Sequence, residues 1–81
     1  MERIKVYTQE NCQPCRLTKQ ALGRAALEFT EISLSDVPEM ISEFQAEGLL
    51  QAPVVDTGEE RWSGFRPDKI RALTKEYGNG S

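Results

Sequence analysis

The spacing of hydrophobic residues divides the first third of the chain into a strand and a helix. In the segment 3–8, apolar and polar residues alternate around Ile4 and Val6, which is the pattern of a half-buried β-strand. The period then lengthens to four residues, which predicts an α-helix that begins near Gln13. The residues that define this helical period are Leu17, Ala21 and Ala25.

The middle of the chain predicts a second strand and a second helix. Residues 28–34 are rich in strand-forming types, and Glu31 interrupts their alternation, which indicates a strand at the edge of a sheet. Asp36 followed by Glu39 resembles a capping box, so we expect the second helix to begin there and Gly48 to end it. Its apolar residues, at helical spacing, are Val37, Met40, Ile41 and Phe44.

The last third of the chain predicts a hairpin and a third helix. Two short strands, 52–55 and 60–62, flank a tight turn at 56–59. Pro67 and Asp68 are expected to open the third helix, because proline is favoured in a first helical turn. The apolar side of this helix consists of Ile70, Leu73 and Tyr77, and residues 78–81 are expected to be a frayed tail.

The predicted order of elements is β-α-β-α-β-β-α, in a single domain that spans residues 1–81. The first three elements form a parallel β-α-β unit, and the last two strands form an antiparallel hairpin. We therefore expect an α/β fold in which three helices flank the two faces of a four-stranded mixed sheet.

Composition and charge exclude several classes of function. The 81 residues contain no histidine, which excludes Ser-His-Asp and Cys-His catalysis and every imidazole metal site. Ten basic and 13 acidic side chains give a net charge of -3, without the basic stripe that nucleic-acid binding requires. The chain begins without a run of apolar residues that resembles a signal peptide. We expect a cytoplasmic monomer that binds neither nucleic acid nor a membrane.

Cys12 and Cys15 are the only cysteines. A disulfide between them would close a very small loop and add only about 2 kcal/mol of stability, which makes a structural role a poor explanation. In a reducing cytosol such a pair is usually redox-active. The alternative is a module that binds zinc or an iron–sulfur cluster, but four ligands would then have to come from two chains.

The cysteine pair lies between the first predicted strand and the first predicted helix, in the plan of a thioredoxin-like domain. The helix N-terminus favours the thiolate and so lowers the pKa of Cys12; Arg16 adds to this effect and Glu10 opposes it. We expect Cys12 to face solvent and attack a substrate disulfide. Cys15, one turn into the helix and directed at the sheet, would resolve the mixed disulfide.

Three segments resemble the NrdH-redoxin branch of the glutaredoxin-like proteins, and the likeness covers nearly the whole chain. They are CQPC at 12–15, LQAPVV at 50–55 and, above all, WSGFRPD at 62–68. The resemblance implies an electron carrier that is reduced by thioredoxin reductase, which uses NADPH, and oxidised by the large subunit of class Ib ribonucleotide reductase. It implies a redox-active Cys12–Cys15 disulfide, no other cofactor and no metal.

The alternative within the same superfamily is a glutathione-dependent glutaredoxin. Glutaredoxins commonly carry a lysine shortly before the first cysteine, where this chain has Gln9, and the segment after Trp62 lacks their glutathione contacts. Both differences argue against glutathione. A further departure is Gln13-Pro14 between the cysteines, where the NrdH branch commonly has Met-Gln or Val-Gln.

The resemblance also implies a set of partner-binding residues. By itself, Pro53 reads as an ordinary trans proline at a strand start; the resemblance makes it cis and leaves Ala52 free to pair with a partner's backbone. By themselves, Trp62 and Phe65 are expected to pack the last helix onto the hairpin. The resemblance implies that Ser63 to Pro67 form a hydrogen-bonded loop that braces the surface beside Cys12. The implied partner-binding residues are Gln13, Pro14, Ala52, Pro53, Trp62, Ser63, Gly64, Phe65 and Arg66.

Overall fold

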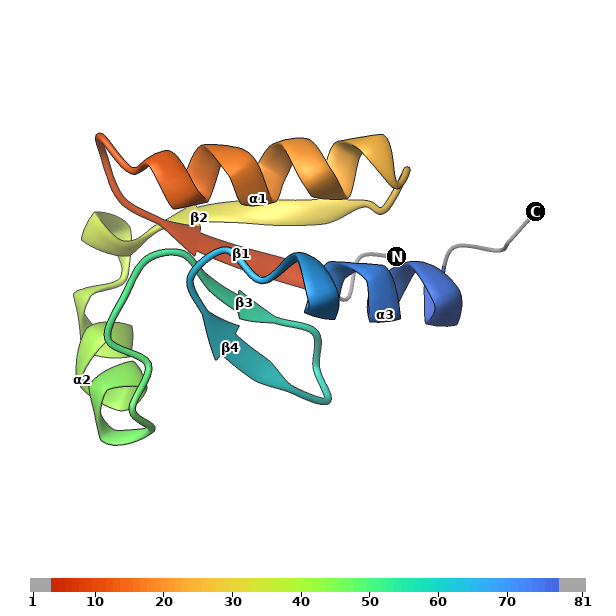
Figure 1. Cartoon of the computed structure of the whole chain (residues 1–81). Coiled ribbons are helices and arrows are strands. Elements are labelled where there is room, and N and C mark those ends of the chain that lie inside the picture. Colours follow the sequence, from red (N-terminus) through yellow and green to blue (C-terminus); the bar gives the residue numbers. More distant parts are fainter. Residues whose placement is uncertain (1–3, 78–81) are drawn as a thin grey trace.

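The structure, a computed structural model, describes residues 4–77 (Figure 1). Its order of helices and strands is the predicted β-α-β-α-β-β-α, with one additional short 3-10 helix, η1. The predicted frayed tail, 78–81, lies outside the described residues. The elements are β1 (Ile4–Thr8), α1 (Gln13–Arg24), β2 (Phe29–Ser33), η1 (Leu34–Asp36), α2 (Pro38–Ala46), β3 (Val54–Asp56), β4 (Arg61–Ser63) and α3 (Pro67–Tyr77).

The four strands form one mixed sheet in the order β2-β1-β3-β4. β1 pairs with β2 in parallel, while β3 is antiparallel to both β1 and β4. This arrangement confirms the parallel β-α-β unit and the C-terminal hairpin. It also confirms that β2, which contains Glu31, is an edge strand.

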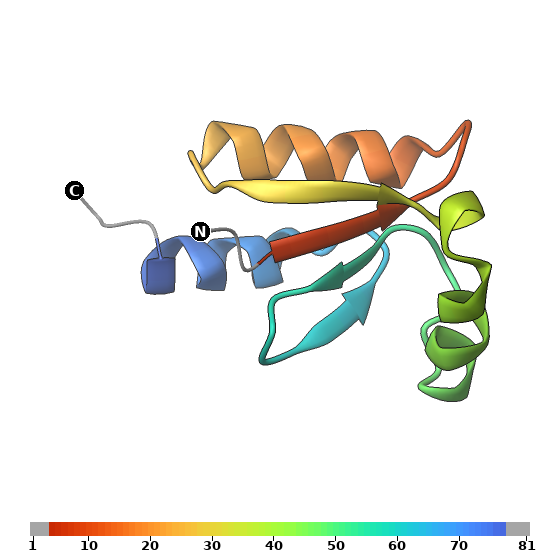
Figure 2. The same ribbon diagram turned by 180° about the vertical axis from the view of Figure 1, so that it is seen from behind.

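The helices cover the two faces of the sheet unequally. Successive strand residues point to opposite faces, so Val55 belongs to a large core beneath α1 and α3, and Val54 belongs to a small cluster beside α2. Figures 1 and 2 show α2 beyond the C-terminal end of β1, separate from α1 and α3. The buried residues of the large core are Ile4, Val6, Leu22, Leu27, Val55, Trp62, Ile70 and Leu73.

The predicted start of α2 is wrong. Asp36 lies in η1 and is not the N-cap; α2 begins at Pro38, and its N-cap residue Val37 makes no side-chain capping hydrogen bond. The physical reason is Pro38, because a proline ring disfavours helical backbone in the residue before it. Val37 accordingly adopts φ -136° and ψ 61°, which separates Asp36 from the helix.

The predicted end of α2 is confirmed by a Schellman motif. Gly48 has φ +80°, its N–H donates to the Gln45 carbonyl at 3.0 Å, and the Leu49 N–H donates to the Phe44 carbonyl at 2.8 Å. These two bonds satisfy carbonyl groups that the end of the helix leaves unpaired. The chain then turns toward β3 and the segment before Pro53.

Candidate functional site: a disulfide at the start of α1

Cys12 and Cys15 form a disulfide at the N-terminus of α1, with their Cα atoms 5.2 Å apart. Cys12 is the N-cap residue, and its Sγ accepts a hydrogen bond from the Cys15 N–H at 3.1 Å. The Cys12 carbonyl accepts the Arg16 N–H at 3.2 Å, which is the first bond of the helical ladder. The Cys12 sulfur therefore lies where unpaired amides and the helix dipole stabilise negative charge.

The structure corrects the expected exposure of Cys12. Its exposed fraction is 7%, against 3% for Cys15, so both cysteines are buried residues. The Cys12 sulfur is turned back against the first turn of α1, where the Cys15 N–H holds it. The two cysteines differ in their accessibility to a substrate, because Cys12 lines a surface pocket and Cys15 does not line it.

This pocket, about 560 Å³ in volume, is the candidate site. It brings four of the predicted site residues together, namely Cys12, Gln13, Pro14 and Ala52, although Ala52 is far from the others in the sequence. The remaining lining residues are Gln9, Asn11, Leu50 and Gln51, which the sequence prediction did not assign to the site. Leu50 carried a usable signal in the sequence, because it is apolar and fits neither the α2 spacing nor the β3 alternation. In the structure its side chain is 73% exposed.

Pro53 directly follows Ala52, which lines the pocket. The Ala52–Pro53 peptide bond is cis, as the family resemblance implies and the residues alone do not. The Pro53 carbonyl accepts the Gly64 N–H at 2.8 Å. Gly64 has φ +81°, and a Cβ there would lie 3.2 Å from the Gln51 Oε1 atom, so a glycine suits both the backbone and the space. The segment after β4 is thereby attached directly beside the candidate pocket.

The other residues of the W-S-G-F-R-P segment lie outside the pocket lining. Trp62 is only 4% exposed and belongs to the large core, and Phe65 packs against that core. This matches the packing interpretation of the two aromatic residues. Arg66 is exposed and pairs with Asp68 at 2.9 Å, which raises the pKa of Arg66 and lowers that of Asp68.

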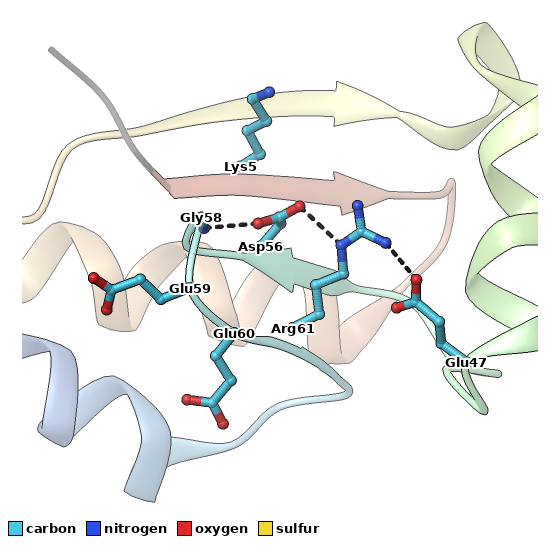
Figure 3. Close-up of a pocket in the computed structure, with 7 residues that line it drawn as sticks. All are labelled: Lys5, Glu47, Asp56, Gly58, Glu59, Glu60 and Arg61. Atoms are coloured by element: carbon cyan, nitrogen blue, oxygen red, sulfur yellow. Dashed lines mark hydrogen bonds and ion pairs between the residues drawn. The ribbon is translucent and has the colours of Figure 1, made fainter.

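A second pocket, of about 530 Å³, lies along the β3–β4 hairpin (Figure 3). Arg61 donates from Nε to Asp56 at 2.9 Å and from Nη1 to Glu47 at 2.8 Å and Glu43 at 2.7 Å. Figure 3 shows the Arg61 side chain between Asp56 and Glu47. Its hydrogen bonds to Glu43, Asp56 and Glu47 raise the pKa of Arg61. Because Arg61 is already paired and the lining contains no thiol, this pocket is a weaker candidate than the one at Cys12.

Within residues 4–77, no group of three or more histidine, cysteine or acidic side chains is placed to hold a metal ion. Over the same residues, no helix is long and apolar enough to cross a membrane.

A C-x-x-C disulfide at the first turn of α1, beside a cis proline in this β-α-β-α-β-β-α fold, defines a thiol–disulfide oxidoreductase of the thioredoxin-like class. The glutaredoxin family model matches residues 4–62. The chain belongs to the glutaredoxin family, within the group of glutaredoxin-like NrdH proteins.

Individual relatives support this assignment. The chain is 42% identical to the glutaredoxin-like protein NrdH of Escherichia coli, over 88% of each chain. It is 31% identical to the NrdH protein of Lactococcus lactis subsp. cremoris, over 86% of this chain and 97% of that protein.

Solved structures agree with the sequence relatives. NrdH-redoxin from Escherichia coli, described as having a thioredoxin-like activity profile, superposes with a TM-score of 0.82 at 42% identity, over 88% of this chain and 93% of that one. Glutaredoxin from Brucella melitensis superposes with a TM-score of 0.67 at 31% identity, over 95% of this chain and 83% of that one.

Proposed function

We propose that the protein carries electrons from a thioredoxin reductase, which draws them from NADPH, to the large subunit of a class Ib ribonucleotide reductase. The observation that supports this most is the Cys12–Cys15 disulfide at the edge of an open pocket. The 42% identity to an NrdH-redoxin with a thioredoxin-like activity profile favours a thioredoxin-type electron source. The protein acts as a monomer in the cytoplasm, and its redox group is the cysteine pair itself.

In the proposed reaction, the Cys12 thiolate attacks one sulfur of the substrate disulfide, and the other substrate sulfur leaves as a thiolate that takes up a proton. Cys15, as a thiolate, then attacks the Cys12 sulfur. This second step forms the Cys12–Cys15 bond, breaks the mixed disulfide and releases the second substrate sulfur. Two electrons pass to the substrate, and the two protons of the dithiol balance those gained by the two substrate thiols.

The shape of the pocket favours an extended segment of a protein substrate. Gln13 and Pro14 line the pocket on the α1 side and Ala52 lines it on the side before Pro53. Ala52 would pair with the substrate backbone by strand addition. The segment from Trp62 to Arg66 would act indirectly, because its Gly64 N–H holds the Pro53 carbonyl at 2.8 Å.

The charge of the pocket argues against the alternative of a glutathione-dependent glutaredoxin. Glutathione carries two carboxylates, and a site that selects it needs positively charged hydrogen-bond donors. The pocket beside Cys12 is lined by uncharged residues, with Gln9 on its rim. A substrate that binds through its backbone and apolar side chains fits such a lining better than a small peptide with two carboxylates does.

The test is consumption of NADPH with thioredoxin reductase as the sole electron source and a protein disulfide in excess. We expect turnover that requires this protein and is abolished by Cys12→Ser. Cys15→Ser is expected to trap a mixed disulfide on Cys12, which mass spectrometry detects as an adduct. No turnover here, combined with turnover when glutathione and its reductase are supplied, would assign the protein to the glutathione-dependent class. Metal analysis of the purified protein separately tests the metal-binding alternative.

A further inference from the structure

Thr18 is a buried polar residue on the inner side of α1. The buried residues of this helix are Cys15, Thr18 and Leu22, and Thr18 is 0% exposed. Its Oγ1 atom has no hydrogen-bond partner among the described residues. A buried hydroxyl without a hydrogen-bond partner destabilises a fold. The packing of the oxidised state therefore does not explain why a threonine occupies this position.

The position of Thr18 in the helix directs its side chain at the turn that carries Cys15. Residues three apart on a helix are neighbours on one side. Helical side chains also lean toward the N-terminus, so Thr18 lies over the preceding turn. In the oxidised state the Cys15 sulfur is bonded to Cys12 and makes no hydrogen bond with the Thr18 hydroxyl. Reduction breaks this bond and leaves a sulfur atom that can accept one.

Four charged side chains on the two helices that flank this buried stripe are paired with other side chains. On α1, Arg16 bonds to Gln13 and Lys19 to Glu31 of β2. On α3, Arg66 bonds to Asp68 and Lys69 to Glu60. Lys5 of β1 is exposed, and Tyr7 of β1, whose pKa is raised mainly by burial, belongs to the cluster on the α2 face. Two buried polar side-chain atoms lack a hydrogen-bond partner among the described residues, namely Thr18 Oγ1 and Trp62 Nε1.

We propose that the Thr18 hydroxyl donates a hydrogen bond to the Cys15 thiolate during the resolving step, and that Thr18 is thereby a positioning residue for this reaction. Thr8, another buried threonine, is not available for this role, because its Oγ1 already donates a hydrogen bond to Glu31 at 2.9 Å. In the resolving step the Cys15 thiolate attacks the Cys12 sulfur of the mixed disulfide. The Cys12–Cys15 bond forms, the bond to the substrate sulfur breaks, and that sulfur leaves with the electron pair and takes up a proton. The inference rests on the dithiol mechanism proposed above.

The size of the effect follows from the charge on the acceptor. Loss of a hydrogen bond to a charged group raises the pKa of the Cys15 thiol and lowers its thiolate fraction about tenfold near neutral pH. The remaining thiolate is more basic and therefore about threefold more reactive. At pH values below the pKa of Cys15, Thr18→Val is therefore expected to slow the resolving step about threefold. At pH values well above this pKa, where the thiol is ionised in both proteins, the substitution is expected to accelerate the step about threefold.

The experiment uses an aromatic disulfide reagent, dithionitrobenzoate, on the reduced full-length protein. Attack by Cys12 releases one coloured thiolate at a rate proportional to reagent concentration, and resolution by Cys15 releases the second at a rate independent of it. We expect Thr18→Val to change only the second phase, with the reversal of sign across the pH range. Thr18→Ser, which retains the hydroxyl, is the matched control and is expected to keep the pH profile of the second phase.

A second measurement isolates the thiol itself. In the Cys12→Ser background, the ultraviolet absorbance of the Cys15 thiolate is titrated with and without Thr18→Val. An unchanged pKa, or a second phase slowed equally at every pH, would overturn the proposal and leave Thr18 a packing residue. If the wild-type protein showed no second phase, the assigned roles of the two cysteines would be contradicted. The titration would still test whether Thr18 donates a hydrogen bond to the Cys15 thiolate. Neither readout involves thioredoxin reductase or its proposed partner.

Discussion

The two faces of the sheet are covered in different ways. On the face beneath α1 and α3, the described core contains eight buried residues drawn from both helices, from three strands and, with Leu27, from the loop before β2. On the face beside α2, the buried cluster consists of Tyr7, Phe44 and Val54. This smaller cluster is supplemented at the surface by Arg61, whose guanidinium lies 5.2 Å from the Phe44 ring and pairs with Glu43 and Glu47 on α2.

The difference indicates that the two faces contribute unequally to the stability of the fold. The redox disulfide begins a helix that is anchored by the large core, so the placement of Cys12 and Cys15 depends on apolar burial. α2 is held by fewer apolar contacts and by exposed ion pairs, each of which contributes little. Segments with few buried contacts are the first to open locally. We therefore expect the α2 face to open at lower free energy than the face that carries the disulfide.

The largest effect that tests this comparison comes from the same substitution on each face. Leu22 is 0% exposed in the large core, and Leu22→Ala is expected to cost about 3 to 5 kcal/mol of unfolding free energy. Leu49 is partly buried against the α2 cluster, and Leu49→Ala is expected to cost about 1 to 2 kcal/mol. Urea unfolding of the oxidised protein measures both. Equal costs would show that the two faces contribute alike.

A smaller effect is expected at Arg61, where α2 joins the hairpin. Arg61→Met removes the pairs with Asp56, Glu43 and Glu47 and is expected to cost about 1 kcal/mol, because these carboxylates are partly solvated. Hydrogen exchange should rise in α2 but not in α1. The matched control is Arg66→Met, which breaks an exposed pair with Asp68 at the start of α3 and should leave stability nearly unchanged. Faster exchange in α1 would contradict the proposed separation of the two faces.

The smallest effect concerns Glu31, which links α1 to the edge of the sheet. Hydrogen bonds from Lys19 and Thr8 lower the pKa of Glu31 below its ordinary value of 4.5. A lowered carboxyl pKa stabilises the fold at pH values above the unfolded-state pKa, and this stabilisation is lost as the pH falls through the folded-state value. Glu31→Gln should therefore reduce stability slightly near neutral pH and leave it unchanged in acid. A constant difference at every pH, measured by urea unfolding, would show that the charge is not the cause.

The sequence predicted the order of elements because that order depends on local periodicity. The strand at 3–8 and the helix that begins at Gln13 were correct to within a residue or two. The prediction failed at Asp36, where a short capping motif is followed by Pro38 and the proline decides where helical backbone can begin. The cis bond before Pro53 also required the family resemblance, because the residues alone favour trans.

What the sequence determined by itself is the chemistry: two cysteines three residues apart at the start of a helix, no histidine, and the segments shared with NrdH proteins. Each of these depends on neighbours along the chain. The tertiary structure alone decided which distant residues meet. It placed Gln51 and Ala52 in the pocket with Cys12 and attached Gly64 to the Pro53 carbonyl. These outcomes depend on sheet order and on competition for the core, which local spacing does not encode.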